Sequence, residues 1–280
     1  YSVITGSKSS KKAKSVITVY DMTHELYPSY FKDSIKVSKK KLDACIQADK
    51  IICISKSTKK DLVRLFKIDK EKIKVIYLGV DNNIFFNSTY KSKQTESIGE
   101  YILYVGPRSG YKNFDTLLNA YIKYEKINKN YKLILFGGEQ KNSRELNIIK
   151  KHGLANNVIY CAGNDQYLSE LYNNAFVFVH TSLYEGFGLT ILEAMACGCP
   201  VIAFNTSSIP EVSGKAALLL EDVSDVNEIG KAIINLDQNS EYRSRLIKEG
   251  IKNAKEFSWN KCAKETLEIY NKLNKIEKTS

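Results

Sequence analysis

Glu185 and Glu193 are separated by seven residues, with Gly186 and Gly188 between them. The apolar run 175–179 before them is short and rich in β-formers, and the run 189–197 after them has helical spacing. The segment therefore predicts a strand, a glycine loop and a helix. A helix that begins directly after such a loop presents unpaired N–H groups to an anion. Carboxylates beside that anion can accept hydrogen bonds from sugar hydroxyls. A phosphate next to a polyol is the chemistry of a nucleotide sugar.

Two cations, Arg108 and Lys112, follow another apolar run, 101–105. If that run is a strand, both lie at its carboxyl end, where ligands of open α/β sheets bind. A guanidinium fork and an ammonium suit a diphosphate that gains negative charge during a reaction. Either residue alone would also fit a solvated surface cation. The surrounding pattern, Gly106-x-x-x-Gly110, is neither a dinucleotide fingerprint nor a P-loop.

The elements that must position these groups alternate between strand and helix, which predicts parallel sheets covered on both faces. Helices are expected over 33–48, 56–66, 166–174, 225–236, 239–256 and 259–275, and short apolar strands over 16–19, 50–55, 73–77, 101–105, 132–136, 157–161, 175–179 and 201–204. Asn, Ser, Lys and Gln replace the apolar pattern after residue 81. We therefore expect one domain over 1–85, a linker over 86–100 and a second domain over 101–256.

The glutamate segment resembles the Glu-x(7)-Glu signature of retaining glycosyltransferases of family 4, also called glycosyltransferase group 1. Ser182-x-Tyr184 before it and the run from Glu193 through Gly198-Cys-Pro200-Val after it are similar to the same family. Gly79-Val80-Asp81 matches the point where that family crosses between its domains. The resemblance implies the GT-B fold, which has two Rossmann-like domains, and a final helix 259–275 that packs back on the first domain.

The resemblance also implies roles for individual residues. Arg108 and Lys112 would hold the donor diphosphate, Glu185 would contact hydroxyls of the transferred sugar, and Glu193 would hold the ribose. Further donor contacts would come from a set of loop and helix residues: Phe187, Gly188, Leu189, Thr190 and Asn164. The role of Glu211 stays open. Such an enzyme needs neither a metal nor another cofactor, since cations and a helix start can neutralise the leaving group.

The first domain departs from the family pattern. The family commonly has a histidine where this chain has Tyr20, directly before Asp21. His24 is nearby, so either His24 or Tyr20 is a candidate donor of a proton to the leaving phosphate. A lone loop histidine is also commonly just a solvated ring. The family's first domain usually starts well before the strand at 16–19, so we expect an incomplete N-terminal domain or a fragment.

The net charge of +11 is unevenly distributed. Basic residues outnumber acidic ones by ten over residues 1–96 and by one over 97–280. A basic region can meet nucleic acid, anionic lipid or a phosphorylated acceptor, and it can also be a merely solvated surface. Residues 1–96 contain none of the known nucleic-acid modules, so we expect no nucleic-acid partner. The chain has no apolar run near the ~20 residues of a membrane span, and its first residues lack the apolar core of a signal peptide. We expect a cytoplasmic protein, with peripheral attachment to the inner face of the membrane as an open alternative.

These patterns favour a retaining hexosyltransferase of polysaccharide biosynthesis. Its donor would be a nucleotide-diphosphate sugar, with GDP-mannose preferred because Ser207-Ser208-Ile-Pro210-Glu211 looks most like bacterial mannosyltransferases. Its acceptor would be a glycan or a lipid-linked sugar. The alternative is a non-catalytic nucleotide-sugar-binding module, or an inactive fragment that lacks the acceptor half.

Overall fold

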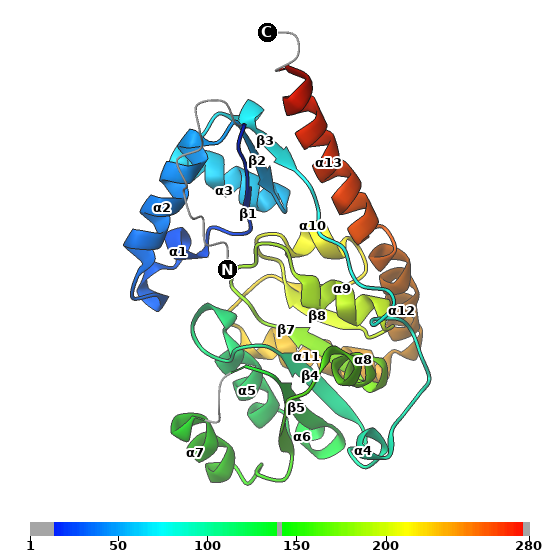
Figure 1. The fold of residues 1–280 in the computed structure, drawn as a ribbon. Helices are drawn as coiled ribbons and strands as arrows, with labels where there is room; N and C mark the ends of the chain where they lie inside the picture. The colour runs from blue at the N-terminus through cyan, green and yellow to red at the C-terminus, as the bar shows by residue number, and fades with distance from the viewer. Residues whose placement is uncertain (1–13, 139–141, 277–280) are drawn as a thin grey trace. The chain divides into compact units, whose positions relative to one another are not determined.

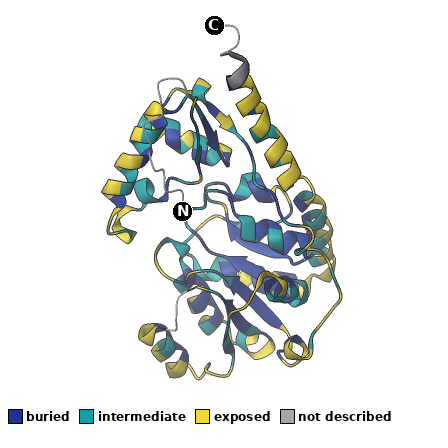
Figure 2. Cartoon of the chain, viewed as in Figure 1, coloured by how far each residue is buried: buried dark blue, intermediate teal, exposed yellow. Residues whose placement is uncertain are grey.

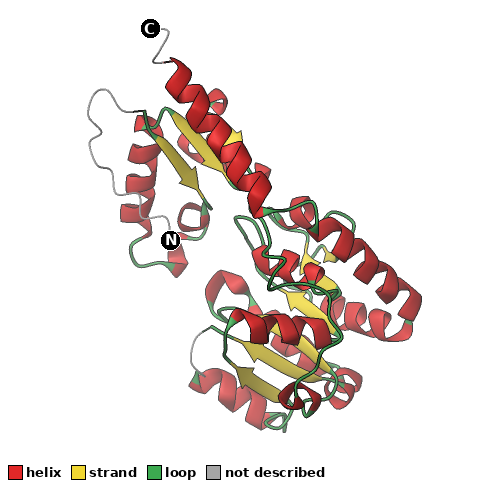
Figure 3. Ribbon diagram, turned by 45° about the vertical axis from the view of Figure 1, so that its right-hand side comes forward, coloured by secondary structure: helices red, strands yellow, loops and turns green. Residues whose placement is uncertain are grey.

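The computed structural model describes residues 14–138 and 142–276, and side chains up to residue 273. By its internal contacts the chain forms two units. Unit 1 contains residues 1–79, 184–188 and 257–280, and unit 2 contains residues 80–183 and 189–256. Each unit is an α/β layer structure with its own parallel sheet (Figures 1 and 3). All six cysteines are free thiols.

Unit 1 is built on a three-stranded parallel sheet in the order β1-β2-β3. Its elements are β1 (Val16–Val19), α1 (Thr23–Leu26), η1 (Pro28–Tyr30), α2 (Ser34–Gln47), β2 (Lys50–Cys53), α3 (Lys56–Phe66), η2 (Lys70–Lys72), β3 (Ile73–Val75) and α13 (Trp259–Ile276). Helix α3 begins where the Ser55 hydroxyl accepts the Thr58 N–H, and it ends at Lys67 in the left-handed region. The first is a common N-terminal cap of a helix and the second a common C-terminal cap.

Helix α13 belongs to unit 1 although it comes last in the chain. Ile269 and Leu273 on α13 form a buried cluster with Ile52 of β2 and Ile76, which follows β3. Most of the other described α13 side chains are exposed (Figure 2). The helix is therefore an amphipathic cover for one face of the small sheet.

Unit 2 contains a six-stranded parallel sheet in the order β6-β5-β4-β7-β8-β9. Its elements are α4 (Lys93–Glu96), β4 (Tyr101–Val105), η3 (Gly110–Lys112), α5 (Phe114–Lys123), α6 (Glu125–Asn130), β5 (Lys132–Phe136), α7 (Ser143–Lys151), β6 (Val158–Cys161), α8 (Asp165–Asn174), β7 (Val177–His180), α9 (Leu189–Ala196), β8 (Val201–Phe204), α10 (Ile209–Ser213), β9 (Leu218–Leu220), α11 (Val226–Gln238) and α12 (Ser240–Ala254). Buried aliphatic and aromatic side chains from β4, β5, β7 and α5 fill its core. The parallel sheets expected from the alternation are confirmed.

The segment 86–100, expected as a linker, runs along helix α8 within unit 2. The N–H of Ser88 donates to Asn173 Oδ1 at 2.6 Å, and the N–H of Ser92 donates to Glu170 Oε1 at 2.6 Å. Ser92 also caps the short helix α4. These bonds satisfy backbone groups that a flexible connection would leave to water.

Candidate functional site

The strand order of unit 2 identifies where this sheet is suited to bind a ligand. From β4 the chain continues to β5 and β6 on one side of the sheet, and from β7 it continues to β8 and β9 on the other side, as in a doubly wound sheet. β4 and β7 are direct neighbours, with Ile102 paired to Val177. A crevice forms at the carboxyl ends of two strands related in this way, and nucleotides bind there. In this chain the segments 106–113 and 181–183 leave those two strand ends.

The two segments are tied together by hydrogen bonds. The Thr181 hydroxyl donates to the Lys112 carbonyl at 2.8 Å, and the Leu183 N–H donates to the Tyr111 carbonyl at 2.8 Å. Asn113 has a φ of 54° and donates its side-chain amide to the Val223 carbonyl at 2.8 Å. The loop that carries Lys112 is therefore fixed at the strand end, and Lys112 lies two residues from the start of α5. Its ammonium lies 5.1 Å from the centre of the Tyr111 ring.

Arg108 is buried in the same loop. Its Nε donates to Glu145 Oε2 at 3.1 Å and its Nη1 donates to the Gly137 carbonyl at 3.1 Å. The two charged side chains are only 2% and 5% exposed. The Tyr160 hydroxyl donates to the other oxygen of Glu145, and the guanidinium lies 5.2 Å from the centre of the Tyr160 ring. In this structure the Arg108 charge is compensated by a glutamate, and its contact with a diphosphate stays a prediction.

Glu193 lies on α9 and is partly buried. Its carboxylate oxygen Oε2 is 3.5 Å from the Tyr172 hydroxyl of α8. Burial is the main cause that raises the pKa of Glu193 to about 7, and the nearby carboxylate of Asp165 raises it further. The Tyr172 hydrogen bond acts in the opposite direction. A carboxyl group held in this way is poised to ionise when hydroxyl donors reach it.

The first turn of α9 presents backbone N–H groups from Leu189 and Thr190. Gly188 precedes it with a φ of 106°, a conformation that favours glycine. The side chain of Phe187 is 3% exposed and contacts the rings of Tyr77 and Phe257 in unit 1. Phe187 therefore has a structural side chain, and only its backbone is available for the predicted donor contact.

Glu185 lies in the segment 184–188, which packs in unit 1. A Cβ atom added to Gly186 would overlap the carbonyl oxygen of Tyr20. The buried Thr58 hydroxyl donates to the Gly186 carbonyl at 3.2 Å and lies 3.5 Å from the Tyr20 carbonyl. The Met22 N–H donates to the Tyr184 hydroxyl at 3.3 Å. The segment that carries Glu185 is therefore fastened to the carboxyl end of β1.

These contacts place the segment that carries Glu185 beside Tyr20, the position at which the family commonly has a histidine. Tyr20 itself is 43% exposed, and Asp21 accepts the Thr23 N–H at 2.9 Å, which starts helix α1. The half-buried His24 ring stacks on Phe31 with ring centres 4.2 Å apart. The structure thus assigns Asp21 a local turn-forming contact and His24 a ring contact. A proton-donating role for His24 or Tyr20 stays a prediction.

Two further predicted residues occupy helix starts in unit 2. Asn164 is exposed and caps α8, where its Oδ1 accepts the Tyr167 N–H at 3.0 Å. Glu211 is in the first turn of α10, directly after Pro210. Both positions are compatible with solvent-facing contacts, and neither role is tested by these bonds.

Three residues that the sequence analysis did not select contribute to the candidate site. Thr58 fastens the Glu185 segment, Glu145 neutralises Arg108, and Asp165 raises the pKa of Glu193. Asp165 directly follows the selected Asn164 at the start of α8, so its position beside a predicted site residue could have indicated it. Thr58 and Glu145 lie on ordinary amphipathic helices, and nothing in their local sequence distinguishes them from solvated residues.

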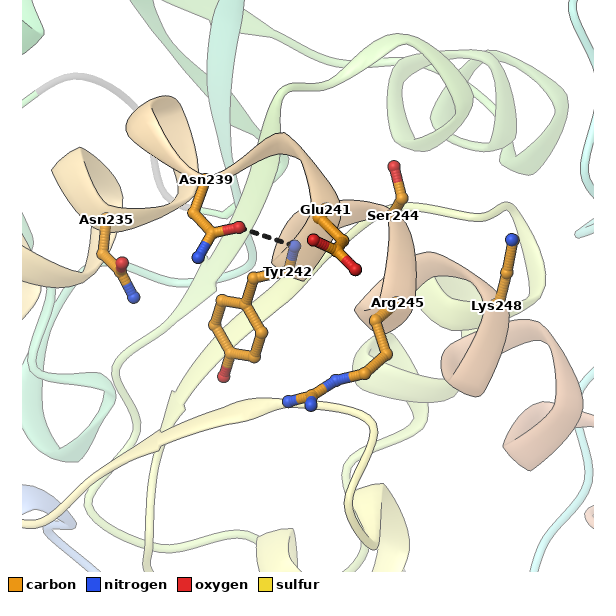
Figure 4. Close-up of a pocket in the computed structure, with 7 residues that line it drawn as sticks. All are labelled: Asn235, Asn239, Glu241, Tyr242, Ser244, Arg245 and Lys248. Atoms are coloured by element: carbon orange, nitrogen blue, oxygen red, sulfur yellow. Dashed lines mark hydrogen bonds between the residues drawn. The ribbon is translucent and has the colours of Figure 1, made fainter.

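A cavity of about 600 Å³ lies elsewhere, at the turn between α11 and α12 (Figure 4). Its lining consists of Asn235, Asn239, Glu241, Tyr242, Ser244, Arg245 and Lys248. Asn239 Oδ1 accepts the Tyr242 N–H at 2.9 Å, so this amide oxygen serves as a helix cap. None of the predicted site residues lines this cavity. Among the described residues, no three His, Cys, Asp or Glu side chains gather as metal ligands do.

Comparisons with known proteins now give the family. The model of "Glycosyl transferases group 1" matches residues 87–253, and that of "Glycosyltransferase Family 4" matches residues 2–83. The chain belongs to the glycosyl transferases of group 1. This group 1 chain is 32% identical over 270 residues to O-antigen chain mannosyltransferase B of Escherichia coli. That match covers 93% of this chain and 71% of the relative.

Solved structures agree with the fold. Sucrose-phosphate synthase from Thermosynechococcus elongatus matches with a TM-score of 0.81 at 23% identity, over 93% of this chain and 68% of that one. Anabaena Alr3699/HepE, solved in complex with UDP and glucose, matches with a TM-score of 0.77 at 21% identity, over 91% and 71%. The chain therefore has the GT-B fold, as the family resemblance implied. Within the described residues, no helix has the length and apolar character to cross a membrane.

Proposed function

We propose that this group 1 chain transfers a hexose from a nucleotide-diphosphate sugar to a glycan or lipid-linked acceptor, with retention of configuration. The observation that carries the proposal is the pairing of loops at the β4–β7 switch point. There the Lys112 loop is hydrogen-bonded to residues 181 and 183, and only Tyr184 separates residue 183 from Glu185 in the sequence. Membership of a glycosyltransferase family supports the same reaction class.

The proposed reaction needs no enzyme nucleophile. The acceptor oxygen forms a bond to the anomeric carbon while the bond from that carbon to the diphosphate oxygen breaks. The proton of the acceptor hydroxyl passes to the departing phosphate on the same face of the sugar. Lys112 and the first N–H groups of α9 would stabilise charge that grows on the diphosphate, where preorganised donors contribute most. Glu193 would accept the ribose hydroxyls and Glu185 those of the hexose.

Mannose is our preferred sugar and GDP-mannose our preferred donor. The sequence Ser207-Ser208-Ile-Pro210-Glu211 first suggested this choice. The similarity to an O-antigen chain mannosyltransferase supports it, and so does the 28% identity to an MMP α-(1→4)-mannosyltransferase of Mycolicibacterium hassiacum over 81% of this chain and 54% of that one. Polysaccharide assembly is the setting that these names suggest for this protein.

The experiment is a thermal-shift screen with GDP-, UDP- and ADP-sugars, followed by a transfer assay with the sugar that stabilises the protein most. We expect GDP-mannose to give the largest shift, and NMR of the product to show the anomeric configuration of the donor. Donor binding without transfer or donor hydrolysis would instead identify a non-catalytic binding module. An inverted product would refute the retaining mechanism.

Glu185→Ala tests the proposed contact with hydroxyls of the transferred sugar. We expect turnover to fall by about two to three decades, which is the scale of losing one preorganised transition-state stabiliser. The melting temperature should be unchanged, because Glu185 is only partly buried. Glu241→Ala, at an exposed position of α12, is the matched control for removing one carboxylate. Near-normal turnover in Glu185→Ala would remove Glu185 from the site.

We further propose that unit 1 rests on an anionic membrane surface through helix α2. Ile35 is 85% exposed and Ile46 is 58% exposed, and the exposed Lys36, Lys39 and Lys40 lie between them on the same helix. Exposed apolar and basic side chains on one helix suit the interface of an anionic bilayer. The double variant Ile35→Ser/Ile46→Ser should float less well with phosphatidylglycerol vesicles, whereas the control Tyr90→Ser should not. Equal flotation of all three proteins, or no preference for anionic vesicles, would contradict this surface.

A further inference from the structure

A second cavity lies within unit 1, between helix α13 and the amino-terminal ends of β2 and β3. Its volume is about 700 Å³, within the range of small-molecule sites. Eight lysines and three glutamates line it: Lys50, Lys59, Lys70, Lys72, Lys74, Lys261, Lys264, Lys272, Glu71, Glu265 and Glu268. We call it the lysine groove. The other lining residues, Ile73, Ile269 and Leu273, are buried against neighbouring elements.

Three of these lysines hold one wall of the lysine groove in place. Lys59 donates to the carbonyls of Lys70 and Ile73 at 3.1 and 2.9 Å, and Lys50 donates to the Glu71 carbonyl at 2.9 Å. Lys72 donates to the Ala48 carbonyl at 3.3 Å. The backbone of residues 70–73 is thereby fixed by side chains from β2 and α3. The wall is a bonded structure and not a loose surface loop.

The other five lysines contribute charge without a partner among the residues that the structure describes. They are Lys70 and Lys74 from the wall and Lys261, Lys264 and Lys272 from α13. Only three glutamates oppose the eight lysines, so the lining carries an excess of positive charge. Recessed surfaces of one sign concentrate the field and attract counter-ions. We propose that the lysine groove is a binding site for a multiply charged phosphate group.

The chemistry of the lining favours phosphate over other anions. Lysine ammonium groups act as point charges that bind phosphate oxygens from many directions, and one multiply charged phosphate group can contact several of them at once. Among the residues that the structure describes, no arginine lines the lysine groove. No described aromatic side chain lines it either, so this lining offers no platform for the bases of a nucleic acid. A phosphorylated lipid headgroup and a free oligophosphate share the chemistry that fits.

The lysine groove is distinct from the proposed transfer site. It borders the first residues of β2 and β3, Lys50 and Ile73. The segment that carries Glu185 is fastened at the opposite edge of the same sheet, where β1 ends and Tyr20 begins. A four-residue strand separates the two edges by about 13 Å. Binding here can therefore be disrupted without altering a residue of the proposed reaction.

The first experiment is calorimetric titration of the full chain with sodium tripolyphosphate. The variant Lys264→Glu/Lys272→Glu reverses two charges in the lysine groove, and Lys231→Glu/Lys252→Glu makes the same change on exposed positions of unit 2. We expect the first variant to bind at least about tenfold more weakly than the unmodified protein, since each ammonium–phosphate bond is worth roughly an order of magnitude in affinity. The control and Lys112→Ala should retain the affinity of the unmodified protein at this site.

The second experiment distinguishes the source of the phosphate. Flotation compares vesicles containing phosphatidylinositol 4-phosphate with vesicles of equal charge made with phosphatidylserine. If Lys264→Glu/Lys272→Glu floats less well only with the phosphatidylinositol 4-phosphate vesicles, the ligand is a lipid headgroup. If the variant floats as the unmodified protein does but binds tripolyphosphate more weakly, the ligand is a free oligophosphate. The proposal is overturned if the groove variant and the unit 2 control behave alike in both experiments, or if Lys112→Ala alone abolishes tripolyphosphate binding.

Discussion

Replacing Glu193 by glutamine should stabilise the protein at neutral and alkaline pH while weakening its binding of a nucleotide. Burial of the carboxyl group, with a smaller contribution from the nearby Asp165 carboxylate, raises its pKa from the ordinary 4.5 to about 7. Ionising it in the folded protein is therefore harder than in the unfolded chain. Glutamine occupies the same volume and can still accept the Tyr172 hydroxyl, but it carries no charge.

The sign and size of the effect follow from proton linkage. Between pH 4.5 and 7 the folded state holds the proton of Glu193 more tightly than the unfolded state, so the stability contributed by this group falls as the pH rises. Below pH 4.5 the group is protonated in both states and costs nothing. A tenfold change in proton affinity corresponds to about 1.4 kcal/mol, so above pH 7 the ionised side chain lowers the free energy of unfolding by about 3 kcal/mol.

Urea unfolding at several pH values from 4 to 8.5 measures this difference directly. The unmodified protein and Glu193→Gln should have nearly equal free energies of unfolding at pH 4, and the variant should be more stable by about 3 kcal/mol at pH 8. Asp165→Asn, which removes the second cause, should shift the curve in the same direction by less. Parallel curves for the unmodified protein and Glu193→Gln would refute the raised pKa. Unchanged nucleotide binding in that variant would refute the ribose contact.

Three other substitutions test the positions of the remaining groups. Lys112→Ala should weaken binding of nucleoside diphosphates more than of nucleosides in calorimetry, and equal losses would contradict a phosphate contact. Arg108→Ala should lower the free energy of unfolding by about 3–5 kcal/mol, because it leaves Glu145 buried without its cation. The double variant Arg108→Met/Glu145→Leu should restore stability, and its transfer rate then reports whether the guanidinium acts on the donor. Gly186→Ala should lower stability by about 1–3 kcal/mol and reduce turnover, since its Cβ overlaps the Tyr20 carbonyl. A variant with unaltered melting and rate would contradict that close approach.

Most elements of the fold were predictable because their apolar patterns are local. The strands at Val16–Val19, Tyr101–Val105 and Val201–Phe204 and the helix at Lys56–Phe66 lie where the sequence placed them. Strand β9, Leu218–Leu220, was missed because three consecutive leucines after two alanines show neither alternation nor a helical period. Helix α4 was missed because its stability comes from contacts with α8, and its own sequence is polar.

The candidate site was predictable where it depends on residues close together in the chain. The glycine loop, the strand before it and helix α9 follow from one stretch of sequence. The environment of Arg108 was not predictable, because its partner Glu145 is 37 residues away on another helix. The attachment of residues 184–188 to Tyr20 and Thr58 is equally remote in sequence. Contacts between residues so far apart leave no pattern in the local sequence. An arginine that forms a buried ion pair also cannot be told from one that binds a ligand by its residue type.

The assembly of unit 1 from three separate stretches of chain has a consequence for biosynthesis. Ile52 and Ile76 are synthesised before unit 2, but Ile269 and Leu273, which cover them, are synthesised after it. At about 5–20 residues per second, the apolar face of the small sheet stays uncovered for roughly 10 to 40 seconds of translation. Unit 2, in contrast, has all of its residues available before α13 is complete. The nascent chain thus carries a finished larger fold and an unfinished smaller one, and the smaller one is where a chaperone would be expected to bind.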